Sequence, residues 1–172
     1  MDLKEYSEIL DTNSLEFVAL INSCNSLELN FKESNVWNIL EIAEHVFLTD
    51  RLVLSLLFKP TEKKAEGEEL LGYDKLNKIL VQLRARRVSA PEIVHPKGQI
   101  MNAADFELTF LNQRNLLKTG IDSGKIKIDK RIYSHPFLGE MTIMDWLYFI
   151  PNHAQRHLEQ IKDLLLLIRP KE

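Results

Sequence analysis

The chain has 172 residues, of which 45% are hydrophobic and 27% are charged, the composition of an ordinary globular protein. A chain of this length can bury a substantial core, so we expect one domain over residues 1–172. The net charge of −3 argues against binding to nucleic acid or to an anionic membrane surface.

The location of the protein is predicted from its cysteine content and its apolar runs. Cys24 is the one cysteine, which excludes an intramolecular disulfide and any multi-cysteine zinc site. The first ten residues show no basic stretch followed by an apolar run, so no secretory signal is predicted. The apolar runs at 52–58 and 164–168 are too short to cross a bilayer. These features predict a cytoplasmic protein that makes no membrane contact.

Two helices are predicted in the N-terminal third. The first covers about Asp2 to Cys24, and its inward stripe is formed by Tyr6, Leu10, Phe17, Ile21 and Cys24. On that stripe Cys24 is expected to be a buried small hydrophobe rather than a reactive thiol. Residues 25–35 are predicted as a polar connection. The second helix is expected to begin near Ser34 or Asn35, either of which can cap it, and to end near Phe58, because Pro60 cannot continue it.

Two further helices are predicted in the middle of the chain. One covers about Tyr73 to Arg87, and cations that suit the negative end of a helix lie at its C-terminus: Arg84, Arg86 and Arg87. A phosphate-binding or nucleic-acid role for these cations is the less favoured alternative. Residues 90–98 are predicted as a loop in which His95, which precedes a proline, is extended and exposed. The next helix covers about 102–119, with Gly120 and Gly124 at its exit.

The C-terminal part is predicted to end in a long helix. Residues 125–133 alternate weakly and could form a short extended piece, and 134–140 are predicted as a loop. The last helix is expected to begin at Thr142 with help from Asp145, and Pro151 inside it predicts a kink. Together these elements predict an all-α fold, most simply a four- or five-helix bundle.

Two histidines, His153 and His157, lie four residues apart on the inward stripe of this last helix. Residues at that spacing lie one turn apart on the same helix face, so both imidazoles can grip one metal ion. Burying an imidazole without a partner is costly, and hydrogen bonds to neighbouring helices are the open alternative to a metal. A third nitrogen ligand could come from His45. The glutamate of the zinc-protease motif His-Glu-x-x-His is absent, which excludes that class of protease.

Two segments of the chain carry a family resemblance. One is Trp37-Asn-Ile-Leu-Glu-Ile-Ala-Glu-His45, and the other joins His135-Pro-Phe-Leu-Gly139 and Thr142 to Ile150-Pro-Asn-His-Ala-Gln-Arg-His-Leu-Glu-Gln160. They resemble the DinB/YfiT-like superfamily, whose members are regarded as metal-dependent enzymes. The resemblance implies a four-helix bundle of up-down-down-up order that is often dimeric. It also implies that one histidine of the second helix and two of the last bind a divalent ion, usually nickel or zinc. His45, His153 and His157 match those three positions.

The resemblance also implies a function. Characterised relatives join a low-molecular-weight thiol to an electrophile, and others are linked to hydrolysis or isomerisation. We therefore expect a homodimeric, metal-dependent enzyme in which a divalent ion activates a thiol or water for attack on a small molecule, with low-molecular-weight-thiol S-transfer as one such reaction. The alternative is a non-catalytic metal- or small-molecule-binding bundle that acts in a stress response. It is favoured by the lack of an obvious general base, and no catalytic residue is assigned.

Three residues near the expected site have open roles. Glu41, one turn before His45, could support a metal ligand, but a surface ion pair is favoured. Arg156 could orient an anionic substrate group or pair with Glu159 or Gln160. His135 is expected to anchor a loop rather than to bind metal.

Overall fold

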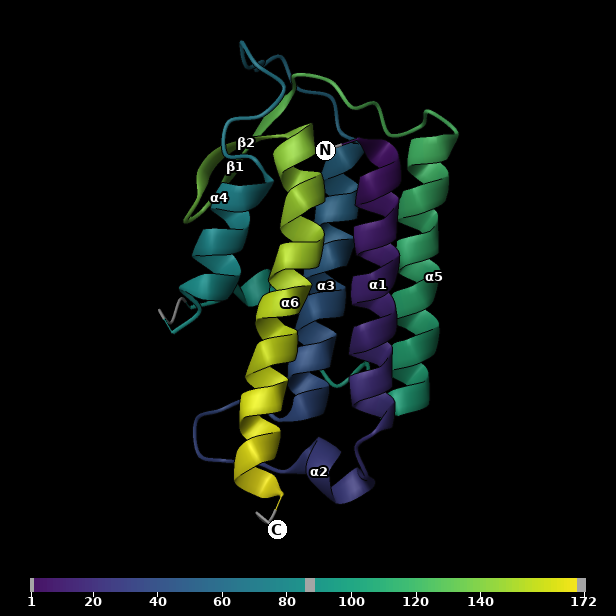
Figure 1. Cartoon of the computed structure of the whole chain (residues 1–172), viewed down its shortest axis with the longest axis vertical. Helices are drawn as coiled ribbons and strands as arrows, with labels where there is room; N and C mark the ends of the chain where they lie inside the picture. Colours follow the sequence, from purple (N-terminus) through teal and green to yellow (C-terminus); the bar gives the residue numbers. More distant parts are fainter. Residues whose placement is uncertain (1, 86–88, 170–172) are drawn as a thin grey trace.

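Four long helices dominate the computed structural model, which describes residues 2–85 and 89–169 (Figure 1). They are α1 (Leu3–Asn22), α3 (Ile39–Leu57), α5 (Ala103–Asp122) and α6 (Ile143–Ile168). Both α1 and α3 pack against α5 and α6, and buried apolar side chains from these helices fill the interior. The described part of the chain is therefore mostly helical, as predicted, and it adds one two-stranded sheet.

The first helix is found as predicted, but the next segment is not a plain connection. Residues Ser26–Asn30 form a short helix, α2, which Asn25 caps in a reciprocal pair of hydrogen bonds with Glu28. The predicted start of the following helix at Ser34 or Asn35 is also wrong. Asn38 caps α3 in the same reciprocal way with Glu41, while Asn35 has a left-handed backbone (φ +61°) that a helix cannot contain.

The predicted helix from Tyr73 to Arg87 is shorter and changes type. It comprises α4 (Tyr73–Asn77), followed by the π-helical turn η1 (Lys78–Gln82). Arg84 forms an ion pair with Asp163 of α6 at 3.3 Å instead of facing a helix end, and Arg86 and Arg87 lie outside the described residues. The loop predicted at 90–98 contains one 3-10 turn, η2 (Glu92–Val94), and His95 is extended and exposed as expected.

A β-hairpin occupies the segment predicted as a loop at 134–140. Strands β1 (Ile132–His135) and β2 (Gly139–Thr142) pair antiparallel, with Ile132 opposite Thr142 and His135 opposite Gly139. The extended piece expected at 125–133 is therefore correct only at its end. Gly139 has φ +79°, a conformation that favours glycine, so it lets the chain reverse at this point. The hairpin and α4 lie beside the N-terminal end of α6 (Figure 1).

The exit of α5 differs from the prediction because the helix continues past Gly120 to Asp122. Gly120 lies against Ile126, and a Cβ atom added there would approach the Ile126 Cδ1 atom to 2.7 Å. The glycine is therefore required by close packing and not by the end of the helix. Gly124, with φ +69°, is the residue whose conformation suits the chain reversal.

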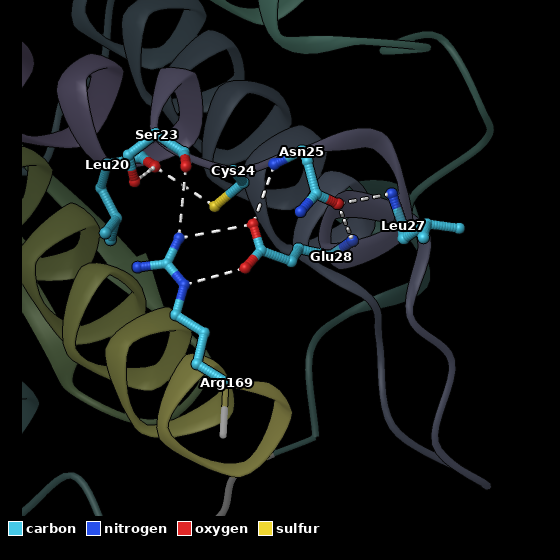
Figure 2. A network of polar contacts seen from close by, with 7 residues as sticks. All are labelled: Leu20, Ser23, Cys24, Asn25, Leu27, Glu28 and Arg169. Atoms are coloured by element: carbon cyan, nitrogen blue, oxygen red, sulfur yellow. Dashed lines mark hydrogen bonds and ion pairs between the residues drawn. The ribbon is translucent and has the colours of Figure 1, made fainter. Parts of the chain in front are cut away.

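The last helix begins where predicted, and its C-terminal end lies near α2. Thr142 and Asp145 form the expected capping pair, and Pro151 lies inside α6. Just beyond α6, the Arg169 guanidinium binds Glu28 of α2 at 2.9 Å and the Ser23 carbonyl at 3.2 Å (Figure 2). Cys24 beside this contact is buried and donates to the Leu20 carbonyl, which confirms its predicted structural role.

The structure bears on one of the broader predictions, that the chain does not span a membrane. None of the described helices combines the length and the apolar character that crossing a membrane requires. The cytoplasmic location and the single domain over residues 1–172 stay predictions.

Candidate metal centre

Three histidines from two helices meet inside the protein. His45 of α3 and His153 and His157 of α6 each offer a ring nitrogen, and these nitrogens all lie within 4.8 Å of one another. The rings are nearly inaccessible, with exposed fractions of 4%, 7% and 8%. The sequence-predicted meeting of these three imidazoles is therefore found in the structure.

Helix geometry accounts for the arrangement. His153 and His157 lie one turn apart on α6, and their Nε2 atoms are 3.2 Å apart. Because α3 packs directly against α6, His45 reaches the same point, with its ring centroid 5.1 Å from that of His153 and 4.8 Å from that of His157. Two distant parts of the sequence thus supply one compact group of nitrogen donors.

Hydrogen bonds on the far side of two rings set their tautomers. His45 Nδ1 donates to the Val94 carbonyl at 2.9 Å, and His157 Nδ1 donates to Oε1 of Gln160 at 2.9 Å. A proton held on Nδ1 leaves the Nε2 lone pair free to bind a metal, which is the usual state of a metal-ligating histidine. His153 differs, because its buried Nδ1 has no hydrogen-bond partner among the described residues.

The three rings are also held in the neutral form. Burial lowers the pKa of His45 below its ordinary value of 6.5. Burial, followed by the neighbouring His157 and His45, lowers the pKa of His153 well below that value. Burial, followed by His45, lowers the pKa of His157 to about 3. Neutral imidazole is the form that binds metal, so the donor set fits a divalent transition-metal ion.

Comparisons with known proteins identify the family of the chain. Residues 9–161 match the model of the DinB superfamily. The chain belongs to the DinB superfamily. The uncharacterized protein YuaE of Bacillus subtilis (strain 168) is 28% identical over 138 residues, which cover 80% of this chain and 83% of YuaE. No solved structure matches the chain.

Aromatic side chains wall the histidine group of this DinB-superfamily chain. The indole of Trp37 lies 4.9 Å from the ring of His45, and Phe149 stacks on His153 at 5.0 Å with an angle of 19° between the rings. Trp37 and Phe149 thus place apolar rings in contact with two of the three histidines. An apolar surrounding of this kind strengthens the interaction of the site with any charged species that it holds.

His135 contacts Phe149, at 5.2 Å between ring centroids, and is not part of the ligand group. Its Nδ1 accepts hydrogen bonds from the backbone N–H groups of Phe137 and Leu138, which confirms the predicted loop-anchoring role. Burial lowers the pKa of His135 to about 4, so the ring is neutral and can accept both bonds at neutral pH.

The other two flanking residues have structural contacts. Glu41 caps α3 and forms an ion pair with Lys32, as the favoured interpretation predicted. Arg156 donates to the Leu80 carbonyl at 3.1 Å, which ties α6 to η1. Glu159, which was one of the partners predicted for Arg156, binds Lys162 and Gln155.

Sequence reasoning missed the Val94 carbonyl that binds His45. A backbone carbonyl carries no signal in the residue type, and Val94 is 49 positions away from His45 along the chain. Gln160 could be noticed because it lies three residues after His157, on the same helix face.

Proposed function

We propose that this DinB-superfamily chain is a metal-dependent enzyme in which His45, His153 and His157 hold a divalent ion, nickel or zinc. The observation that carries the proposal is the buried group of three ring nitrogens within 4.8 Å of one another. The hydrogen bonds from His45 and His157 to Val94 and Gln160 support it, because a proton held on Nδ1 leaves the Nε2 atom of each ring unprotonated.

The ligand set leaves room for a reactant. Three protein nitrogens fill three coordination positions of a divalent ion and leave at least one open, as in catalytic rather than structural sites. A divalent ion in such a site lowers the pKa of a water or thiol and makes it nucleophilic near neutral pH. In this proposal the three histidines hold the ion, while the rings of Trp37 and Phe149, which contact His45 and His153, limit the access of bulk water to it.

The reaction we propose is attack by a low-molecular-weight thiol, or by water, on a small electrophile. Support comes from the family membership and from the ligand pattern. A low-molecular-weight-thiol S-transferase is the specific form that we favour. No described side chain near the three rings is assigned as a general base, so the proton of the nucleophile is expected to pass to solvent.

The fold and assembly are proposed on the same basis. We infer a single domain in which α1, α3, α5 and α6 form an up-down-down-up four-helix bundle, supported by the mutual packing of these helices (Figure 1). The homodimer is proposed from the family resemblance, and light scattering coupled to size-exclusion chromatography tests it. A mass equal to the 20.0 kDa chain at micromolar concentration would contradict the dimer.

Metal content tests the proposed site. Protein purified without a chelator or a nickel column is expected to contain about one divalent ion per chain, and an anomalous-scattering map is expected to place it among the three histidines. His45→Ala and His157→Ala should lose the ion. Gln155→Ala is the matched control, because Gln155 lies between His153 and His157 on α6 but binds Asn13 and Glu159 instead of a ring of the site. Wild-type protein that takes up no stoichiometric metal would overturn the proposal.

The second candidate is a non-catalytic metal- or small-molecule-binding bundle of a stress response. The observation that favours it is the burial of all three rings, with exposed fractions of 8% or less. A turnover screen of metal-loaded protein with several thiols and electrophiles separates the two functions. Turnover that His157→Ala abolishes supports the enzyme, whereas consistent inactivity of the loaded protein supports the binding module.

A further inference from the structure

The carboxylate of Glu44, the residue before His45, binds a loop that lies far away in the sequence. It is almost fully buried, with an exposed fraction of 1%. Oε1 accepts from the Lys97 N–H at 2.8 Å, and Oε2 accepts from the Gly98 and Gln99 N–H groups at 2.9 and 3.1 Å. Hydrogen bonds to an ionised acceptor are about twice as strong as neutral ones, so Glu44 holds this loop firmly against α3.

The same loop carries the acceptor for His45. The Val94 carbonyl lies 2.9 Å from His45 Nδ1, and Val94 itself is buried. Two consecutive residues of α3, Glu44 and His45, therefore form hydrogen bonds with the two ends of the segment 94–99. His45 makes one bond at the start of the segment, whereas Glu44 makes three at its end.

The backbone of the loop is shaped for the carboxylate. Three consecutive backbone N–H groups converge on the Glu44 carboxylate, and together they form an anion-binding concavity. Gly98 has φ +76°, a conformation that a residue with a Cβ rarely adopts, and a Cβ added there would meet nothing within 4 Å. The glycine is therefore needed for backbone conformation and not for space.

We propose that Glu44 is a positioning residue for the metal centre. By fixing residues 97–99 it places the Val94 carbonyl against His45 Nδ1, and so holds the proton of His45 on Nδ1 with the Nε2 lone pair towards His153 and His157. If the carbonyl moves away, the neutral ring is free to carry its proton on Nε2, where it blocks metal binding. The functional meaning of this arrangement rests on the proposed metal site, but the tautomer of His45 can be measured without metal.

The test compares Glu44→Gln with wild type in the metal-free state. Long-range nitrogen–proton correlation NMR, at a pH where the rings are neutral, assigns the tautomer of each histidine. Wild-type His45 is expected to be protonated on Nδ1 alone. Glutamine replaces one accepting oxygen by a donating amide, so E44Q is expected to show a mixture of tautomers at His45 and an unchanged His157. Zinc affinity of E44Q is expected to fall by about tenfold, as for other residues that support a ligand.

Asp145 offers a matched control within the same chain. It is also buried and accepts from three consecutive backbone N–H groups, those of Leu70, Leu71 and Gly72, at 2.8 to 3.1 Å. Its loop contributes no acceptor to the three histidines. Asp145→Asn also perturbs the capping pair with Thr142 at the start of α6, so it disturbs the fold at least as much as Glu44→Gln does. It is expected to release a loop of the same kind while His45 stays protonated on Nδ1.

The outcomes decide between the alternatives. Folded E44Q in which His45 keeps the wild-type tautomer would overturn the proposal, even if zinc affinity falls. A mixture at His45 in D145N as well would also overturn it, because the effect would then be general loosening. If wild type binds no metal, the proposed function fails while the tautomer result still decides the role of Glu44. Should E44Q not fold, Gly98→Ala strains the same loop from its own backbone, and an unchanged His45 tautomer in G98A would contradict the proposal.

Discussion

Gln160 accepts a hydrogen bond from His157 across one turn of α6, with 2.9 Å between its Oε1 and the Nδ1 of the ring. This bond fixes the ring orientation and leaves Nε2 unprotonated. Gln160→Leu removes the acceptor and keeps a side chain of similar size. We expect the dissociation constant for zinc to rise by about 10- to 100-fold, the usual effect of losing a partner behind a metal-bound histidine.

Competition with a chromophoric chelator measures this change in affinity. Gln155→Leu is the matched control, because Gln155 is also half-buried on α6 but binds Asn13 and Glu159 instead of a ring of the site. Equal zinc affinities for Q160L, Q155L and wild type would show that the bond to His157 has no role in metal binding.

A second prediction concerns the buried ion pair between Asp50 of α3 and Arg114 of α5. Nε of Arg114 lies 2.7 Å from Oδ2 of Asp50, and the exposed fractions of the two side chains are 3% and 2%. Arg114→Met leaves the carboxylate without its counterion, and breaking a buried pair in this way costs about 3–5 kcal/mol of unfolding free energy. Denaturation in guanidinium chloride at neutral pH measures the loss.

The pH dependence of that loss identifies its cause. Burial raises the pKa of Asp50 to about 6, against the opposing effect of Arg114. Without the arginine, the ionised carboxylate is disfavoured further, so the destabilisation of R114M should grow as pH rises and shrink as pH falls and Asp50 takes up a proton. The double variant Asp50→Asn/Arg114→Met should lose less stability than R114M alone. A loss that does not change with pH would point to lost packing of Arg114 on Phe110 instead.

A third prediction follows from His135 in the hairpin. Burial lowers its pKa from 6.5 to about 4, so the unfolded chain binds a proton here at a higher pH than the folded chain does. The folded state therefore loses stability as pH falls from about 6.5 towards 4. Protonation of Nδ1 would also break the bonds from Phe137 and Leu138. Because the ring is partly accessible to solvent, we expect a contribution of about 1–2 kcal/mol rather than the full value of the shift.

Replacing His135 by asparagine isolates this contribution. The asparagine oxygen can accept from the same backbone N–H groups but does not titrate in this range. The unfolding free energy of H135N should therefore fall less steeply than that of wild type between about pH 6.5 and pH 4. Identical slopes for the two proteins would show that the titration of His135 is not coupled to folding.

The sequence predicted the parts of the structure that local patterns determine. Helix α6 begins at Thr142 as expected, because a capping pair and a regular apolar stripe both point to that position. The start of α3 was placed too early. Ser34, Asn35 and Asn38 can all cap a helix, and only Asn38 has the glutamate three residues later that completes the reciprocal pair.

The three candidate ligands were predictable, whereas their supports were mostly not. His153 and His157 share a helix face, and His45 was a candidate for the third ligand to which the family resemblance added support. The bonds from Val94 to His45 and from residues 97–99 to Glu44 join segments that no sequence spacing relates, and they use backbone groups that every residue possesses. The hairpin at 132–142 was missed for a similar reason, since its register depends on pairing rather than on a strong alternation.

The distribution of the three histidines over α3 and α6 couples occupancy of the site to the integrity of the fold. An ion shared by both helices would cross-link segments that separate when the chain unfolds, and the unfolded chain offers no comparable site. By mass action, free ion at a hundred times its dissociation constant would add about 2.7 kcal/mol to the unfolding free energy. The melting temperature would then rise with the concentration of free metal, so the thermal stability of the protein would depend on how much of it is metal-bound.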